Sequence, residues 1–366
     1  MSHFIYARLN RVALLGAAVL GLLAVHPAQA QLSVFSSGAY SLPETISIVP
    51  AGFGASNGQI FIPDGISSVI HVVPITGGAE AVFAGPAGLP NGINSGLFVP
   101  ASFGGAAAGK YVAFGVDGNS SIVNSSGVGT PFVTLPNTQF TTSLIAPASF
   151  GAYAGQIIAM DEGTTIQALA INSAGTVTKV ANFSFVPFGS LVAPTGFGGV
   201  GGKILVDNES GGGDIVALGA DGSLTPFANI PLKTGQVGLR QMTMAPAGFF
   251  PGVNQPLLLV SVTGSHKGGG TLGDVVALDS NGNVVESLRD NLGLTAFDPR
   301  GLLFLDSTHL LLSDSSQIPN QRQGQILELT GGAFNATTPE PGTVALLGAL
   351  FVAGGACFRS RRARRA

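Results

Sequence analysis

The sequence predicts an all-β fold, a six-bladed β-propeller built from four-stranded antiparallel blades. The first observation behind this prediction is composition. Hydrophobic residues make up 45% of the 366 residues, charged residues only 10%, and 54 residues are glycine. A chain of this kind can bury a core, and it lacks the long helical patterns of an α-rich domain. The other two observations are a repeated motif and the short strand-like runs between its copies.

The motif is an apolar run followed by a proline, a variable residue and a Gly or Ser, as in "LFVPASFGG" and "LVAPTGFGG". It occurs at six prolines, and successive copies lie 47 to 53 residues apart. Periods of this size that contain strands are typical of propeller blades. A pair of β-sandwiches, the main alternative, does not readily account for the regular spacing. The six repeats begin near Pro50, Pro100, Pro147, Pro194, Pro246 and Pro299.

Each repeat contains enough strand-like runs for one blade. In the third repeat, the run around Pro147 is followed by "QIIAMDEG", "TTIQALAI" and "TKVANF". Glycine turns such as "SAGTV", "ADGSL" and "SNGNV" separate later runs, which indicates hairpins. The four runs predict one four-stranded antiparallel blade per repeat.

The ends of the repeat region predict how the ring closes. The sixth repeat stops after "GQILELTGG" and lacks its last strand, whereas the segment "LSVFSS" near residue 32 precedes the first repeat. Pairing of this N-terminal strand with residues 301–330 would complete the sixth blade and leave no free sheet edge. The predicted propeller domain therefore spans residues 31–332.

A phenylalanine follows five of the prolines at a constant distance. The simplest interpretation is that these side chains pack between blades, and a row of rings for ligand stacking is the alternative. The residues are Phe53, Phe103, Phe150, Phe197 and Phe249.

The first 30 residues have the features of a secretory signal peptide. Arg8 and Arg11 precede an apolar run over residues 12–25, and Ala28 and Ala30 form an A-x-A site that predicts cleavage before Gln31. An N-terminal membrane helix, the alternative, fits the short run and the small residues less well.

The C-terminal end carries a second targeting pattern. Residues 333–342 form a linker that contains Pro339, Glu340 and Pro341, and residues 343–366 are predicted to form a hydrophobic helix with a basic tail. The apolar run is short for a relaxed transmembrane helix, and its arginines would stay on the cytoplasmic side. The basic cluster consists of Arg359, Arg361, Arg362, Arg364 and Arg365.

This order of features resembles the PEP-CTERM sorting signal of Gram-negative bacteria. The resemblance covers the chain from Thr338 onward. It implies processing by an exosortase, transient anchoring in the inner membrane, and delivery to the cell surface or extracellular matrix, with exopolysaccharide as a further partner. An ordinary tail anchor is the alternative, although it usually has a longer apolar stretch. The resemblance implies nothing about the chemistry of the propeller.

The exported portion, residues 31–338, has nine basic and eighteen acidic residues and so a formal charge of −9. Such a surface repels nucleic acid and anionic polymers, and it favours cations or neutral partners. Nucleic-acid binding is therefore excluded.

The blade pattern also resembles NHL-type six-bladed propellers, in which a strand ending in Asp precedes a strand rich in Ile or Leu. This loose resemblance implies the fold alone.

Acidic residues end the second strand-like run of five blades, and Thr263 takes that place in the fifth. Equivalent loops of a propeller share one face, so these carboxylates would surround its mouth. They could hold Ca²⁺, which prefers six to eight oxygen ligands, or they could cap the backbone of turns. The five acids are Asp64, Asp117, Asp161, Asp207 and Asp314. The candidate metal ligands are Asp161, Glu162, Asp207, Asn208, Glu209, Asp214 and Asp314.

Catalytic signatures are scarce, and no catalytic residue is assigned. The mature sequence has three histidines, His71, His266 and His309, without a paired metal spacing, and no nucleophile motif is present. The leading hypothesis is a non-enzymatic exported binding or structural module. The alternative is a metal-dependent propeller hydrolase, lactonase or lyase. A lectin-like module is a third possibility, against which the absence of Trp and the scarcity of Tyr argue.

Overall fold

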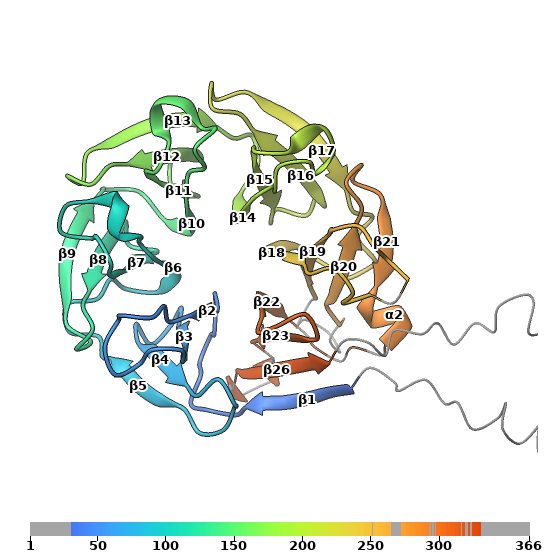
Figure 1. The fold of residues 1–366 in the computed structure, drawn as a ribbon, viewed down its shortest axis with the longest axis horizontal. Coiled ribbons are helices and arrows are strands. Elements are labelled where there is room, and N and C mark those ends of the chain that lie inside the picture. Colours follow the sequence, from blue (N-terminus) through green and yellow to red (C-terminus); the bar gives the residue numbers. More distant parts are fainter. Residues whose placement is uncertain are drawn as a thin grey trace, which may run out of the picture. The chain divides into compact units, whose positions relative to one another are not determined.

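The computed structural model describes residues 31–330 except 251, 265–271, 293, 295, 297, 316, 319–320 and 323. These residues form six four-stranded antiparallel sheets arranged in a ring (Figure 1). The predicted six-bladed propeller is confirmed. The predicted signal peptide and the C-terminal linker, helix and basic tail lie outside the described residues. Within the described chain, no helix is long and apolar enough to cross a membrane.

In the first five blades the four strands pair in the order of the chain, from the innermost outward. Blade 1 contains β2 (Ser47–Ile48), β3 (Ile60–Pro63), β4 (Ile70–Val73) and β5 (Ala81–Ala84); blade 2 contains β6 (Ile93–Phe98), β7 (Tyr111–Gly115), β8 (Asn119–Val123) and β9 (Gly129–Thr134). Blade 3 contains β10 (Phe140–Ile145), β11 (Ile157–Asp161), β12 (Gln167–Ile171) and β13 (Val177–Asn182). Blade 4 contains β14 (Pro187–Val192), β15 (Ile204–Asn208), β16 (Asp214–Leu218) and β17 (Leu224–Asn229). Blade 5 contains β18 (Gly238–Ala245), β19 (Leu257–Thr263), β20 (Asp274–Leu278) and β21 (Val284–Ser287), followed by the short helix α2 (Leu288–Leu292).

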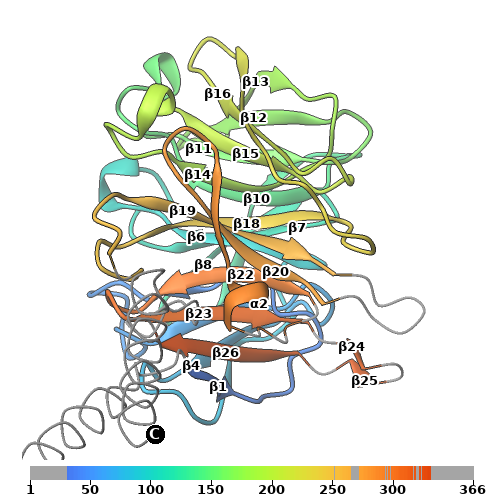
Figure 2. The same ribbon diagram turned by 90° about the vertical axis from the view of Figure 1, so that its right-hand side faces the viewer.

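Blade 6 closes the ring with strands from both ends of the domain. Its order is β22 (Pro299–Phe304), β23 (His309–Asp314), β26 (Gln325–Thr330) and then β1 (Gln31–Ser36). Strand β1 pairs antiparallel with β26, with Leu32 opposite Leu329 and Val34 opposite Leu327. The side view shows these strands stacked in sequence, with the small hairpin of β24 (Gln317–Ile318) and β25 (Gln321–Arg322) at one end (Figure 2). The predicted closure by the N-terminal strand is confirmed.

The repeated proline motif forms a turn immediately after the innermost strand. In blade 3, the backbone N–H of Phe150 donates to the carbonyl oxygen of Pro147 at 2.9 Å, and the equivalent bond occurs in blades 1, 2, 4 and 5. The turn directs the phenylalanine back toward the sheets, where Phe150 and Phe249 are fully buried. The packing interpretation is thereby confirmed.

The sixth copy of the motif differs from the expectation. Pro299 lies at the start of the innermost strand β22, whereas the other five prolines follow that strand. After β22 the chain turns at residues 305–308, where the Asp306 carboxylate accepts the backbone N–H groups of Thr308 and His309. An Asp-initiated turn therefore replaces the Pro-Phe turn in the last blade, and the sequence match at Pro299 is out of register.

The hydrophobic core is divided among the interfaces between neighbouring blades. Between blades 2 and 3, for example, Val112 and Phe114 of β7 pack with Ile157 of β11 and Leu169 of β12. Hydroxyl groups near the axis add direct bonds between blades. Thr141 donates to the carbonyl oxygen of Pro187 at 2.7 Å. The packing and these hydrogen bonds fix the relative positions of neighbouring innermost strands, and so they also position the charged groups at the strand ends.

Candidate functional site: an axial cluster of charged residues

The predicted acids lie at one end of the propeller because each innermost strand begins where the second strand ends. Asp161 is opposite Phe140 at the start of β10, and Asp314 is opposite Pro299 at the start of β22. In blade 4 this place belongs to Asn208, which is opposite Pro187. Asp207 precedes it by one residue, so its side chain points to the other face of the sheet.

Hydrogen bonds to the backbone occupy these acids. The Asp64 carboxylate accepts four backbone N–H groups, including that of Ser41 at 2.6 Å and that of Ser67 at 2.9 Å. Burial would raise the pKa of Asp64, but His71 and these N–H donors outweigh it and hold the pKa below its ordinary value. His71, whose Nε2 lies 3.7 Å from Asp64, also pairs with Glu80.

The other predicted acids have similar partners. Asp117 accepts the N–H groups of Asn91 and Asn119, each at 3.1 Å, and Asp161 accepts that of Gln139 at 2.9 Å. Asp314 accepts the N–H of Asp298 at 2.9 Å. Each of these acids joins the end of a second strand to the segment before an innermost strand, so the turn-capping interpretation describes what these carboxylates do in the structure.

The candidate metal ligands among residues 207–214 each form hydrogen bonds with a different partner. Asp207 accepts the N–H of Gly189 at 2.6 Å, and burial raises its pKa to about 7 despite that bond. Asn208 accepts the N–H and the hydroxyl of Ser210, and Asp214 accepts the side-chain amide of Asn229 at 2.6 Å. Asn208 and Asp214 both lie beside Gly212, whereas Asp207 bonds to the backbone of the innermost strand β14.

Charged residues of five blades interact instead near the propeller axis, and we call this group the axial cluster. Its acids are Glu44 ahead of β2, Glu162 after β11, Glu209 after β15 and Asp298 ahead of β22. Its bases, Arg240 in β18 and Arg300 in β22, come from innermost strands. Four carboxyl groups and two guanidinium groups therefore share one end of the axis.

Arg300 organises one side of the axial cluster. Its side chain is 10% exposed and donates to Glu44 at 2.5 Å, to Asp298 at 2.9 Å and to Ser315 at 3.1 Å. Ser315 in turn donates to Asp298. Burial alone would lower the pKa of Arg300, but Asp298 and Glu44 raise it further, so the guanidinium stays charged.

Arg240 organises the other side. Its guanidinium lies 2.5 Å from Glu209 and donates from Nε to the hydroxyl of Thr263 at 3.3 Å. It also lies over the ring of Phe188, 4.2 Å from the ring centroid, in a cation–π contact. The planar group is therefore held in one orientation between two strands of blade 5 and the neighbouring blade 4.

Three acids of the axial cluster, Glu44, Glu162 and Glu209, have pKa values above the ordinary range of a carboxyl group. Burial raises the pKa of Glu44 to about 7 in spite of Arg300, and burial together with the charge of Glu209 raises the pKa of Glu162 to about 7. Burial also raises the pKa of Glu209, with Arg240 opposing it. Perturbed carboxyl groups in one place are a frequent feature of functional sites, although structural ion pairs also produce them.

Sequence reasoning identified Glu162 and Glu209 but missed Glu44, Arg240, Asp298 and Arg300. A usable signal was present, since each arginine interrupts a run of otherwise apolar or neutral residues in an innermost strand, in "GLRQMTM" and "PRGLLF". A charge inside a buried strand normally requires a partner. The partner in another blade becomes evident only when the ring is closed.

The arrangement does not fit a divalent cation. In the described part of the chain, no three His, Cys, Asp or Glu side chains are grouped so that they could hold a metal ion. At the axis, guanidinium groups take the Oε1 atoms of Glu44 and Glu209 that a Ca²⁺ ion would need as ligands. Of the candidate metal ligands, Glu209 is in an ion pair, and Asp161, Asp207, Asn208, Asp214 and Asp314 accept hydrogen bonds from the protein, whereas Glu162 lies near Glu209 without such a bond among the described residues.

Comparison of the sequence with protein families and with curated proteins finds no match. Comparison of the structure finds propellers of different activities. Regucalcin, a calcium-binding protein from Agrobacterium tumefaciens, superposes with a TM-score of 0.56 at 15% identity, over 81% of this chain and 94% of its own. A gluconolactonase from Xanthomonas campestris superposes with a TM-score of 0.53 at 14% identity, over 85% of this chain and 92% of its own. The PQQ-bound aldose sugar dehydrogenase from Streptomyces coelicolor superposes with a TM-score of 0.55 at 12% identity, over 83% of this chain and 99% of its own.

These similarities define the class of protein as a six-bladed β-propeller of the architecture shared by gluconolactonase and regucalcin. At such low identity they show the fold alone. Their activities differ from one another, so the fold does not select among them.

Proposed function

We propose that the protein is an exported propeller, delivered to the cell surface or extracellular matrix and processed by an exosortase, that acts as a non-enzymatic binding or structural module. The signal-peptide pattern of residues 1–30 and the Pro-Glu-Pro, apolar and arginine order from Pro339 onward support the export and processing steps. No family match supports them independently, so the proposal rests on those residues.

One observation carries the non-enzymatic part of the proposal. Three of the four axial carboxyl groups are paired within the protein, Glu44 and Asp298 with Arg300 and Glu209 with Arg240. The two guanidinium groups compensate the buried charge of these acids, and they leave the acids in a poor arrangement for holding a catalytic metal.

Export and processing are tested in a Gram-negative host that encodes an exosortase. A tagged full-length chain should reach the cell surface with its tail removed, whereas P339A/E340A/P341A should remain uncleaved in the inner membrane. The matched control, N335A/T337A, changes two residues ahead of the region that resembles the sorting signal and should be processed like the wild type. Equal processing of all three chains would contradict the sorting proposal.

A second function has one observation in its favour. Glu162 is half-buried, has a pKa raised to about 7 by burial and by Glu209, and could serve as a general acid or base without a metal. Regucalcin and gluconolactonase share the fold, and this makes a lactone the first substrate class to test. Hydrolysis that is abolished in Glu162→Gln but kept in Glu80→Gln would favour this enzyme over the binding module.

Metal dependence has its own test. Thermal unfolding in Ca²⁺ and in chelator should give the same midpoint, because a ligand raises the midpoint only by binding the folded state. A rise of several degrees in Ca²⁺ that Asp161→Ala or Asp207→Ala removes would overturn the assignment of these carboxylates as caps.

A further inference from the structure

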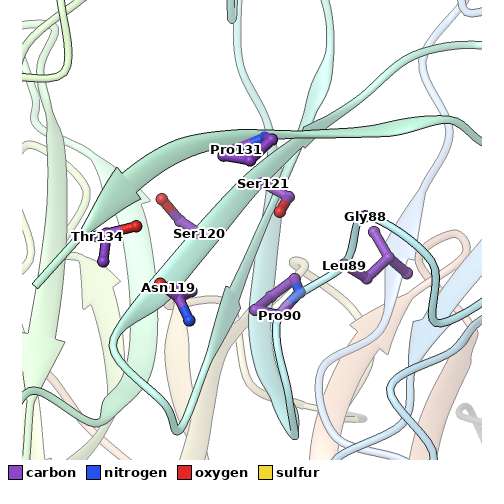
Figure 3. A pocket seen from close by; sticks show the side chains of 8 residues that line it. All are labelled: Gly88, Leu89, Pro90, Asn119, Ser120, Ser121, Pro131 and Thr134. Atoms are coloured by element: carbon purple, nitrogen blue, oxygen red, sulfur yellow. The ribbon is translucent and has the colours of Figure 1, made fainter.

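A cavity at the side of blade 2, lined by β8, β9 and the segment that connects blades 1 and 2, is separate from the axial cluster. It has a volume of about 240 Å³ and opens beside strands β8 and β9 (Figure 3). The segment ahead of β6 forms its opposite wall, with Leu89 and Pro90 facing the two strands. Its main lining residues are Leu89, Pro90, Asn119, Ser121, Pro131 and Thr134.

The cavity exists because blade 2 departs from the pattern of its neighbours. The strand pairings align Ser121 of β8 with Leu169 of β12 and Val216 of β16. Leu169 fills the interface between blades 2 and 3, and Val216 packs at the interface between blades 3 and 4. Ser121 is only 4% exposed, so a small hydroxyl side chain occupies a position where these two blades have a space-filling aliphatic group.

The walls of the cavity are held in place by close backbone contact. A Cβ atom on Gly88 would clash with the carbonyl group of Gly129, and one on Gly129 would clash with Gly88. The two glycines therefore let the segment ahead of β6 lie directly against the start of β9. Asp117 also ties this segment to β8 by accepting the N–H groups of Asn91 and Asn119. The cavity is thus formed before any ligand arrives.

The lining chemistry selects the class of ligand. Leu89 and the rings of Pro90 and Pro131 provide apolar contact surface, whereas Ser121, Thr134 and Asn119 provide hydroxyl and amide groups. None of the lining residues is ionisable. A volume below the range of about 300–1,000 Å³ for drug-sized ligands limits the occupant to one small ring.

We propose that this cavity beside blade 2 binds a neutral, polyhydroxylated ligand of the size of one sugar ring. The apolar side of such a ring would contact the prolines and Leu89, and its hydroxyl groups would exchange bonds with Ser121 and Thr134. The proposal does not depend on the axial cluster. Because no charge is involved, binding should not change with salt concentration or between about pH 5 and pH 8.

The test uses the full chain and ligand-observed saturation-transfer NMR with D-glucose, D-galactose and N-acetyl-D-glucosamine, each titrated to tens of millimolar. At least one sugar should show saturable transfer. Thr134→Phe should fill the cavity and reduce the transfer at least about tenfold, whereas Asn182→Phe should leave it unchanged. Asn182 is the matched control because it holds the same position on β13 as Thr134 does on β9.

Ser121→Leu provides a second variant, since it restores the aliphatic side chain of the neighbouring blades. It should abolish transfer without lowering the unfolding midpoint. Absence of saturable transfer from all three sugars would overturn the proposal. Equal transfer in wild type, Thr134→Phe and Ser121→Leu would do so as well, because it would place the bound sugar elsewhere on the surface.

Discussion

Arg300 and Glu44 form a buried ion pair at 2.5 Å although 256 residues separate them in the chain. Arg300 belongs to the innermost strand of the last blade and Glu44 precedes that of the first. The Ser313 hydroxyl adds a bond to the carbonyl oxygen of Glu44 at 2.8 Å. The ring is thus closed near its axis by polar side chains, in addition to the pairing of β1 with β26 at its outer edge.

Removal of one partner of this pair should be costly. Arg300→Met leaves the buried carboxyl groups of Glu44 and Asp298 without their cation, and we expect a loss of about 3–5 kcal/mol in the free energy of unfolding. The double variant Glu44→Gln/Arg300→Met should lose less than the sum of its single variants. Urea titrations of all three measure this coupling.

The matched control for this cycle is Asp290→Asn. It breaks the Lys233–Asp290 pair, which has a similar distance of 2.6 Å but side chains that are 41% and 55% exposed, and it leaves the contact of Lys233 with the buried Asp274 in place. Its cost should not exceed about 1 kcal/mol. Similar losses for Asp290→Asn and Arg300→Met would show that the axial pair has no special role in closure.

Strand β1 should be required for a monomeric protein. A chain that begins at residue 37 lacks Gln31–Ser36 and exposes the edge of β26, so we expect a lower midpoint of thermal unfolding and self-association in size-exclusion chromatography. The reference is the chain that begins at Gln31. Added peptide QLSVFS should restore the monomer, and an unchanged monomeric truncation would refute the closing role of β1.

Stability should decrease as the pH rises from about 4 to 7. The pKa values of Glu44, Glu162 and Asp207 are raised to about 7, so the folded protein binds more protons than the unfolded chain in this range. The free energy of unfolding therefore falls with increasing pH, and this part of the stability is lost above the folded pKa.

Asp207 offers the cleanest test of this linkage because it is fully buried. Asp207→Asn keeps an oxygen that can accept the N–H of Gly189 but no longer titrates. Urea titrations at about pH 5 and pH 8 should show a smaller difference for the variant, by a few kcal/mol at about 1.4 kcal/mol per unit of pKa shift. An identical pH dependence of the two proteins would contradict the raised pKa of Asp207.

The close approach of blades 4 and 5 should make one glycine irreplaceable. A Cβ atom on Gly189 would clash with the Asp207 side chain and lie 2.5 Å from the carbonyl oxygen of Arg240. We expect Gly189→Ala to cost about 1–3 kcal/mol. Gly199→Ala, where nothing lies within 4 Å, is the control and should be neutral in the same denaturant titration. Equal stability of both variants would show that the blades can separate without cost.

Most of the fold was predictable from local signals. The apolar runs, glycine turns and proline period gave the correct number of blades and strands, and the unpaired strand near Leu32 correctly predicted the closure with residues 325–330. These features depend on neighbours within one blade, so the pattern along the chain suffices. The sixth copy of the motif, at Pro299, was wrong: it lies at the start of the innermost strand, about one strand length from its place in the other blades. A short motif does not indicate the register of a strand.

The candidate site was predictable only in part. The pattern along the chain predicted that carboxylates end the second strands and therefore lie at one end of the propeller. Only the closed ring shows that Arg300 pairs with Glu44 and Arg240 with Glu209, and that Ser121 lines a cavity. Ring closure brings together side chains from blades far apart in the chain, and the free energy of such charges and cavities depends on burial and distance, which no local pattern contains.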